Sequence, residues 1–214
     1  LPALQTRLQP IQLSTQIPLI ENGTIDIVCG PATNTLERQK VVAFSDTIFV
    51  SSIRAVVRKD APIRAFEDLG GRPVSLTSGS TSIGLLSARA QANNFQTKNI
   101  LTPDHAASFL ALTTGRSEAF VMDDILLASL IAGSPTPSDW RIIDDSLRTE
   151  PYGLILRKGD PEFKALVDKT LAAIKLVAPR DDAADWARRL REAALKDSAG
   201  KELDGVIQTI KSFA

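Results

Sequence analysis

The sequence predicts an α/β fold of two lobes joined by a hinge, and three observations support this prediction. Short β-rich runs alternate with helical stretches, which is typical of layered α/β proteins with largely parallel strands. Two β-rich runs, at residues 47–59 and 152–158, flank the middle of the chain. The middle repeats a strand followed by a helix, which indicates one compact lobe of βαβ units. A ligand of such a hinged fold would lie in the cleft and contact both halves.

The first predicted elements are a strand, a helical turn and a second strand. The strands are expected at residues 4–8 and 24–29, where β-forming residues gather. A short helical turn at residues 17–21 should end at Asn22-Gly23, because glycine readily adopts the left-handed conformation that closes helices.

The run at residues 47–59 is too long for an ordinary strand, so we expect it to cross between the lobes, and residues 152–158 to return. Lobe 1 is then residues 1–49 and 155–214, and lobe 2 is residues 50–154, with hinge crossings near 47–53 and 149–156. Within lobe 2 we expect strands at 73–77, 118–122 and 140–143, and helices from about Ser80, at 105–114 and at 123–132.

Three helical stretches should follow the second crossing. They lie at residues 161–177, 181–195 and 200–213. We expect them to be amphipathic and to pack onto lobe 1.

Composition excludes several classes of function. Twenty-five basic residues balance twenty-five acidic ones, which gives no electrostatic footprint for nucleic acid. The single cysteine, Cys29, and the single histidine, His105, cannot assemble a usual Cys/His zinc site, so no metal or other cofactor is expected. The chain begins with Leu1 and not methionine, which suggests a processed or excised piece whose targeting information has been removed.

The strongest local signal for a binding site is TSGSTS, residues 77–82, at a strand-to-helix turn. Backbone N–H groups, the helix dipole and the hydroxyls of Ser80 and Thr81 would converge there on an anion. The Lys-[Ser/Thr] ending of a Walker loop is absent, and the GxSxG elbow of hydrolases does not fit. Ser80 could also serve only to cap its helix, which is compatible with ligand binding.

Two further groups of charged residues are candidates. Arg38, near Thr33 at the end of a strand, could hold a carboxylate in a bidentate fork, or it could be a solvated helix residue that pairs with Glu37. Asn34 or Thr35 could cap that helix. Asp123 and Asp124 follow a strand at its carboxyl end, where a carboxylate could bind an amine or simply cap the next helix.

His105 opens a helix and could be a surface imidazole or an N-terminal helix residue. A Ser/His/Asp triad would have to use this histidine, and no nucleophile stands in a recognisable elbow. No catalytic residue is therefore assigned.

Longer segments carry a family resemblance. The stretch from Glu21 to Phe49, ENGTIDIVCGPATNTLERQKVVAFSDTIF, resembles the signature region of family 3 extracytoplasmic solute-binding proteins for polar amino acids, above all their glutamate/aspartate branch. Three further segments are similar to that branch and come in the same order: FEDLGGRPVSLTSGSTS, PDHAASFLALTTGRSEAFVMDD and PYGLILRKGDPEFKALVD. The resemblance covers roughly residues 10 to 175 and implies a two-lobed periplasmic-binding-protein-like (type II) fold.

The resemblance also implies roles for particular residues. Arg38 would clamp the α-carboxylate of an amino acid, helped by Thr33 and by Thr81 in the turn that contains Ser80. Asp123 would receive the α-ammonium group, and His105 would lie near the ligand side chain. Further implications are a periplasmic location and delivery of the ligand to the membrane subunits of an ABC importer.

Departures from the branch are equally informative. An arginine suited to a side-chain carboxylate stands here as Gln16, and two serines stand as Leu13 and Pro31, so a second ligand carboxylate would be poorly compensated. The first residues align with the second strand of lobe 1, which leaves that lobe without its usual first strand and helix. The incomplete lobe would need rearrangement, a partner chain or association with itself as a homo-oligomer.

The leading hypothesis is a non-enzymatic domain that binds an amino acid or related small carboxylate. One alternative is a truncated scaffold without ligand affinity that acts through protein interaction or oligomerisation. Others are a receptor sensor domain and a dehydratase-like enzyme on the same fold, for which an acid/base constellation is missing.

Overall fold

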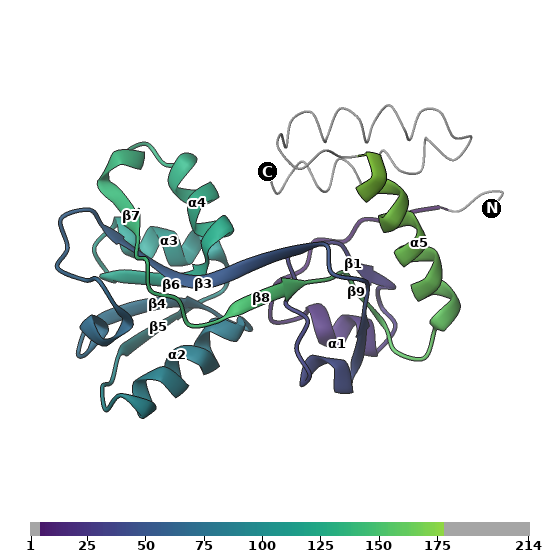
Figure 1. Cartoon of the computed structure of the whole chain (residues 1–214), viewed down its shortest axis with the longest axis horizontal. Coiled ribbons are helices and arrows are strands. Elements are labelled where there is room, and N and C mark those ends of the chain that lie inside the picture. The colour runs from purple at the N-terminus through teal and green to yellow at the C-terminus, as the bar shows by residue number, and fades with distance from the viewer. Residues whose placement is uncertain (1–4, 178–214) are drawn as a thin grey trace. The chain divides into compact units, whose positions relative to one another are not determined.

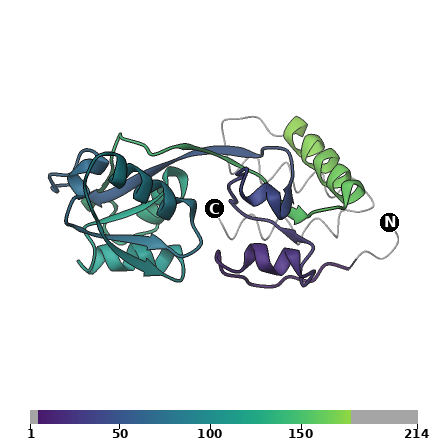
Figure 2. The ribbon, with the colours of Figure 1, turned by 90° about the horizontal axis from the view of Figure 1, so that it is seen from below.

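The computed structural model describes residues 5–177, and these form two compact units (Figure 1 and Figure 2). Among them, unit 1 comprises residues 5–10, 17–48 and 152–177, and unit 2 comprises residues 11–16 and 49–151. The chain thus leaves unit 1 after Ile48 and returns to it at Tyr152, which is close to the expected crossings near 47–53 and 149–156.

Unit 1 is built on a small antiparallel sheet. Its described strands lie in the order β1-β9-β2, with Ile155 of β9 opposite both Val28 and Phe44. All three of these side chains are buried, so the core of the unit gathers around β9. Its elements are α1 (Gln16–Glu21), whose first residue groups with unit 2, β1 (Ile27–Val28), the 3-10 helix η1 (Arg38–Lys40), β2 (Val42–Phe44), β9 (Ile155–Arg157) and α5 (Pro161–Val177).

Two strand predictions for this unit need correction. Residues 5–8 form no strand; they are exposed, and β1 is only two residues long, so the backbone there has no ladder to join. The strand predicted at 24–29 is reduced to β1 because Thr24 takes part in a local turn. Its N–H and hydroxyl both donate to Asn22 Oδ1, at 2.9 and 2.7 Å. The turn predicted at 17–21 is confirmed as α1, and Gly23 closes it at φ 74°.

Unit 2 is a mixed sheet with helices on both faces. Strand β4 pairs in parallel with β5 and β6, whereas β3 runs antiparallel to β6 and β7. The described order is β5-β4-β6-β3-β7, and β8 also pairs with β3. The elements are β3 (Phe49–Arg58), the 3-10 helix η2 (Phe66–Leu69), β4 (Pro73–Thr77), α2 (Thr81–Ala92), β5 (Lys98–Thr102), α3 (His105–Thr113), β6 (Ala119–Asp123), α4 (Asp124–Ala132), the 3-10 helix η3 (Pro137–Asp139), β7 (Trp140–Ile142) and β8 (Thr149–Tyr152).

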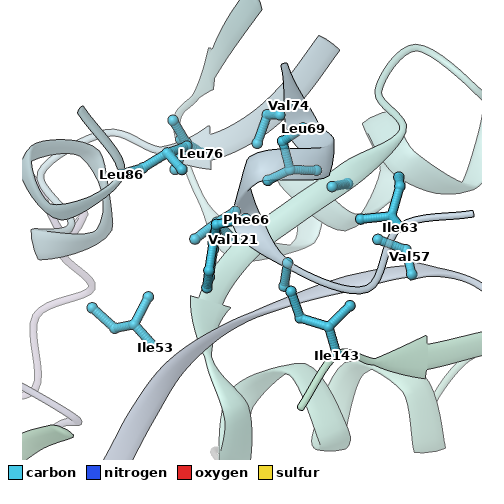
Figure 3. Packing of buried hydrophobic residues seen from close by; sticks show 12 residues of the cluster. Ile53, Val57, Ile63, Phe66, Leu69, Val74, Leu76, Leu86, Val121 and Ile143 are labelled. Carbon is cyan, nitrogen blue, oxygen red and sulfur yellow. The ribbon is translucent and has the colours of Figure 1, made fainter. Parts of the chain in front are cut away.

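The two faces of this sheet carry separate hydrophobic clusters because successive strand residues point to opposite sides. On β6, Val121 joins the cluster under α2 and η2, which Figure 3 shows, and Phe120 and Met122 join the cluster under α3 and α4. Figure 1 shows α2 on one side of the sheet and α3 and α4 on the other, and Figure 2 looks onto the α2 side. Both faces are therefore covered, as the repeated strand-helix pattern predicts.

The two long β-rich runs end differently from each other. Residues 47–59 form the single ten-residue strand β3. Residues 152–158 divide into the end of β8 and β9, because Gly153 comes so close to the chain that a Cβ there would lie 3.1 Å from the Ser45 carbonyl oxygen. The break lets the Leu154 N–H donate to the Ser45 hydroxyl at 2.9 Å.

Residues 11–16 belong with unit 2, although we expected all of residues 1–49 in lobe 1. Their backbone packs on the turn after β4: a Cβ on Gly79 would lie 2.7 Å from Ser14 Cα. This close backbone approach explains why the segment groups with unit 2.

The predicted helix at 161–177 is confirmed as α5. The helices predicted at 181–195 and 200–213 lie outside the described residues. Within residues 5–177, no helix has both the length and the apolar character needed to cross a membrane.

Candidate functional site

Three strands of unit 2 end side by side at one edge of its sheet. Because β4 is parallel to β5 and to β6, their carboxyl ends, at Thr77, Thr102 and Asp123, lie at the same edge. In open α/β sheets this is where ligands bind. We call residues 77–82, 102–105 and 123–124 the carboxyl edge.

The turn at the end of β4 leads directly into α2. Gly79 adopts φ 84°, and Ser80 takes the N-cap position, but its side chain makes no capping hydrogen bond. Among the described residues, the Ser80 and Ser82 hydroxyl oxygens are buried without a hydrogen-bond partner. A buried hydroxyl that lacks a partner costs about 1–3 kcal/mol, so both hydroxyls keep unused hydrogen-bonding capacity at the positive end of the helix.

Thr81 has a partner that sequence reasoning missed. Its hydroxyl donates to Glu150 Oε2 at 3.2 Å, and Glu150 is fully buried on β8. The other carboxylate oxygen accepts a hydrogen bond from Arg148 Nε at 2.7 Å, and Arg148 Nη2 lies 2.6 Å from the same oxygen as an ion pair. Since the single hydroxyl proton of Thr81 points to Glu150, the donor that Thr81 offers to an anion is its backbone N–H.

His105 is half-buried at the start of α3, so it is not a surface imidazole. Its Nδ1 lies 2.8 Å from the Thr77 hydroxyl. Burial lowers the pKa of the imidazole below its ordinary value, and the neighbouring Asp104 carboxylate acts weakly in the opposite direction. Asp104 caps α3 by accepting the Ala107 N–H at 2.7 Å. The ring is thus held neutral and fixed at the carboxyl edge.

Asp123 and Asp124 do different jobs. Asp124 accepts the Ser51 hydroxyl at 2.7 Å and lies 3.4 Å from Arg54 Nε, which fastens the start of α4 to β3. Asp123 occupies the N-cap position of α4 without a side-chain capping bond and is only 2% exposed. Both carboxylates therefore lie at the carboxyl edge, where the sequence predicts them, and their part in ligand binding stays a prediction.

Arg38 and Thr33 come together in unit 1. The guanidinium donates from Nη1 to the Thr33 carbonyl at 3.0 Å, and the Arg38 N–H donates to Thr35 Oγ1 at 3.1 Å, so Thr35 is the residue that closes this turn. Glu37 pairs with Lys40. Ser80, Thr81, Asp123 and His105 belong to unit 2, and the role of all six residues in ligand binding stays a prediction.

The position at which the sequence departs from the glutamate/aspartate branch is also buried. Gln16 is 4% exposed, and its amide Nε2 has no hydrogen-bond partner among residues 5–177. It follows the segment whose Ser14 packs on Gly79, so it belongs to unit 2 with the carboxyl edge. A buried, unpartnered amide is a second signal of a polar ligand.

Other chemistry finds little support in the described part of the chain. No group of three or more His, Cys, Asp or Glu side chains there is arranged to hold a metal ion. Burial raises the pKa of the Cys29 thiol, which keeps it protonated and weakly nucleophilic.

Comparison with known proteins places the chain in one family of solute-binding proteins. Residues 3–177 match the family described as bacterial extracellular solute-binding proteins, family 3. The glutamate/aspartate import solute-binding protein of Salmonella typhimurium is 47% identical over 171 residues, which are 80% of this chain and 57% of that protein. The glutamine-binding protein of Geobacillus stearothermophilus is 33% identical over 149 residues, which are 69% of this chain and 54% of that protein. These relatives are solute-binding proteins and not enzymes, which is the class predicted from the sequence.

Solved structures agree with this assignment. The arginine-bound form of truncated ArgBP from T. maritima aligns with a TM-score of 0.70 at 30% identity, over 78% of this chain and 76% of that one. An ancestral arginine-binding protein bound to arginine aligns with a TM-score of 0.73 at 28% identity, over 86% of this chain and 78% of that one. The predicted two-lobed type II fold is thereby confirmed, although the chain spans 57% of the length of its Salmonella relative. The chain belongs to the family 3 bacterial extracellular solute-binding proteins.

Proposed function

We propose that this chain binds a free amino acid outside the cytoplasm and presents it to the membrane subunits of an ABC importer. The observation that carries the proposal is the carboxyl edge of unit 2. There the N-terminus of α2 and the unpartnered Ser80 and Ser82 hydroxyls can accommodate an anion, and Asp123 stands at the end of the next strand. Donors for a carboxylate beside an acceptor for an ammonium group match the zwitterion common to all amino acids.

Arg38 and Thr33 of unit 1 are proposed to contribute to binding of the α-carboxylate. A guanidinium can form two parallel hydrogen bonds to a carboxylate, which gives both strength and orientation. The bond from Arg38 Nη1 to the Thr33 carbonyl uses one of the five N–H donors of the guanidinium and fixes its direction.

The names of the relatives support the class of ligand. They include binding proteins for glutamate/aspartate, for glutamine and for arginine, all of which share the α-amino and α-carboxylate groups. We also propose a periplasmic location and partnership with an ABC importer from the family of the chain. These are proposals because the chain covers only part of its relatives.

A thermal-shift screen of the 214-residue chain against the proteinogenic amino acids tests the proposal. A ligand at 100 times its Kd stabilises the native state by about 2.7 kcal/mol, which raises Tm by roughly 5–10 °C for a protein of this size. Arg38→Ala should abolish the shift. Lys40→Ala, which removes a charge from the same turn, should keep it, because Lys40 is exposed and its partner among residues 5–177 is the exposed Glu37.

One observation favours a second function. The described sheet of unit 1 has three strands of two or three residues each, and the chain spans 57% of its Salmonella relative. The second candidate function is therefore that of a scaffold, in which two copies associate and complete this sheet, in place of amino-acid binding. No thermal shift with any amino acid, together with a dimer mass in light scattering, would support that function over amino-acid binding.

A further inference from the structure

A chain of buried hydroxyl groups leads from His105 into the interior of unit 2. His105 Nδ1 lies 2.8 Å from Thr77 Oγ1, which lies 3.0 Å from Ser108 Oγ, which lies 2.5 Å from Thr102 Oγ1. This hydroxyl chain ends on the backbone carbonyl of Asp104, which accepts from Thr102 at 3.1 Å. Thr77 and Ser108 are fully buried and Thr102 is 8% exposed, so water has little access to the three hydroxyls.

The number of protons available determines which atom donates in each hydrogen bond of the hydroxyl chain. There are four contacts, and each needs one proton between its two heavy atoms. The terminal carbonyl can only accept, so Thr102 donates to Asp104, Ser108 donates to Thr102, and Thr77 donates to Ser108. The three hydroxyl protons are then used, and the contact with His105 must be supplied by the ring itself.

The opposite arrangement leaves a contact without a proton. If Thr77 donated to Nδ1, three protons would have to serve four contacts, and two oxygen lone pairs would face each other at one of them. In a buried site such a contact is destabilising, because no water is there to hydrogen-bond the two oxygen atoms. The hydrogen-bond arrangement with a proton on Nδ1 satisfies all four contacts.

We propose that the buried hydroxyl chain holds His105 as the Nδ1–H tautomer, so that Nε2 offers a lone pair and selects ligands with a hydrogen-bond donor on the side chain. The ligand part of this inference rests on the proposed amino-acid binding. His105 follows β5 at the carboxyl edge, and Nε2 has no hydrogen-bond partner among the described residues, so this lone pair is the group that the ring has left to offer.

Gln16 supplies the complementary preference. Its buried Nε2 is a donor without a partner in the described part of the chain, so it calls for an acceptor. A primary carboxamide has an NH2 group, which can donate to His105 Nε2, and a carbonyl oxygen, which is the kind of acceptor that Gln16 Nε2 lacks. A carboxylate has only acceptors and would set its lone pairs against that of Nε2. The ligand class is therefore an amino acid with a side-chain carboxamide.

The tautomer can be measured without any ligand. The chain contains one histidine, so a long-range 1H–15N correlation spectrum of the 15N-labelled protein shows the ring nitrogens of His105 alone. At pH 8 we expect Nδ1 to be the protonated, pyrrole-type nitrogen and Nε2 the pyridine-type one. A pyrrole-type Nε2 would overturn the proposal whatever the protein binds.

Variants of the hydroxyl chain test its cause. Thr77→Val removes the acceptor of the Nδ1 proton at nearly constant volume, and the ring should then change to the Nε2–H tautomer. Thr77→Ser keeps the hydroxyl and should keep Nδ1–H. Thr113→Val at the other end of α3 is the matched control, because the Thr113 hydroxyl bonds to the Leu110 carbonyl and has no place in the hydroxyl chain. Retention of Nδ1–H in folded Thr77→Val would contradict the assigned cause.

Titration calorimetry at pH 8 completes the test. Glutamine or asparagine should bind at least about tenfold more tightly than glutamate or aspartate, because a site built for hydrogen bonds discriminates strongly against a mismatched group. In Thr77→Val this preference should shrink. Equal or tighter binding of the dicarboxylic amino acids would overturn the specificity alone. Binding of no amino acid would overturn the proposed function as well.

Discussion

The protein has one histidine, His105, so a single residue should govern how its stability changes near neutral pH. In the native state burial lowers the pKa of His105 below its ordinary value near 6.5. The unfolded chain therefore takes up a proton first as pH falls, and the free energy of unfolding must fall with it. The stability that the neutral ring contributes is fully present above about pH 6.5 and is lost progressively below it.

We predict that the free energy of unfolding, measured by urea denaturation, decreases from pH 7 to pH 5 with a slope of at most about 1.4 kcal/mol per pH unit. His105→Gln should remove this slope, because glutamine does not titrate. Identical pH profiles for the two proteins would contradict the account of a buried, neutral imidazole.

Gly79 provides a second residue-scale test. Its φ of 84° disfavours any other residue, and an added Cβ would lie 2.7 Å from the backbone Cα of Ser14, which cannot move aside like a flexible side chain. Gly79→Ala should cost about 1–3 kcal/mol of unfolding free energy. Gly84→Ala is the matched control in α2, where nothing lies within 4 Å, and should stabilise by roughly 0.5–1 kcal/mol. Equal effects in urea denaturation would refute the docking of residues 11–16 on this turn.

Residue-scale prediction worked where the decisive interaction is local in sequence. Asn34 or Thr35 was expected to cap the helix before Arg38, and Thr35 accepts the Arg38 N–H; Asp123 and Asp124 were both expected at the carboxyl end of a strand, and both lie where β6 meets α4. The partner of Thr81 could not be predicted, because Glu150 lies 69 residues away on another strand. The hydroxyl chain behind His105 was missed for the same reason, since it joins three separate elements.

At the scale of elements, the contact of β8 with α2 depends on one buried carboxylate. Glu150 is 0% exposed and accepts from Arg148 and Thr81, so an uncharged side chain there would leave weaker bonds in a buried place. Glu150→Gln should lower the unfolding free energy by about 1.5–3 kcal/mol. Glu118→Gln, at an ion pair with Arg72 that is partly exposed, should change it by less than about 0.5 kcal/mol. Urea denaturation that gave similar losses for both variants would rule out this role.

Element-scale prediction succeeded where the hydrophobic pattern is strong and failed at sheet edges. The strand at 73–77 and the helix at 161–177 are found with the expected bounds, because a buried alternating run and an amphipathic period are properties of the sequence itself. The strand expected at 4–8 required a neighbour that the described residues do not supply. The run at 152–158 was divided by the approach of Gly153 to Ser45, which no periodicity reveals.

For the whole molecule, the two units should differ in stability. Strand β3 of unit 2 has ten residues and partners on both sides, whereas the described strands of unit 1 have two or three residues each. Amide hydrogens in β3 and β6 should therefore exchange with deuterium at least tenfold more slowly than those in β1 and β2. Uniform exchange rates across these strands, measured by NMR, would mean that the two units open as one.

Amino-acid binding by this protein depends on whether the carboxyl edge of unit 2 holds the α-groups of the ligand, as we propose. The most direct measurement is a titration of the 15N-labelled chain with glutamine, followed through its backbone amide signals. We expect the amides of residues 78–82 and 123–124 to shift most, and those at the exposed Arg58–Asp60 turn to stay unchanged. Shifts confined to other segments, or none at saturating glutamine and any other amino acid, would contradict this proposal.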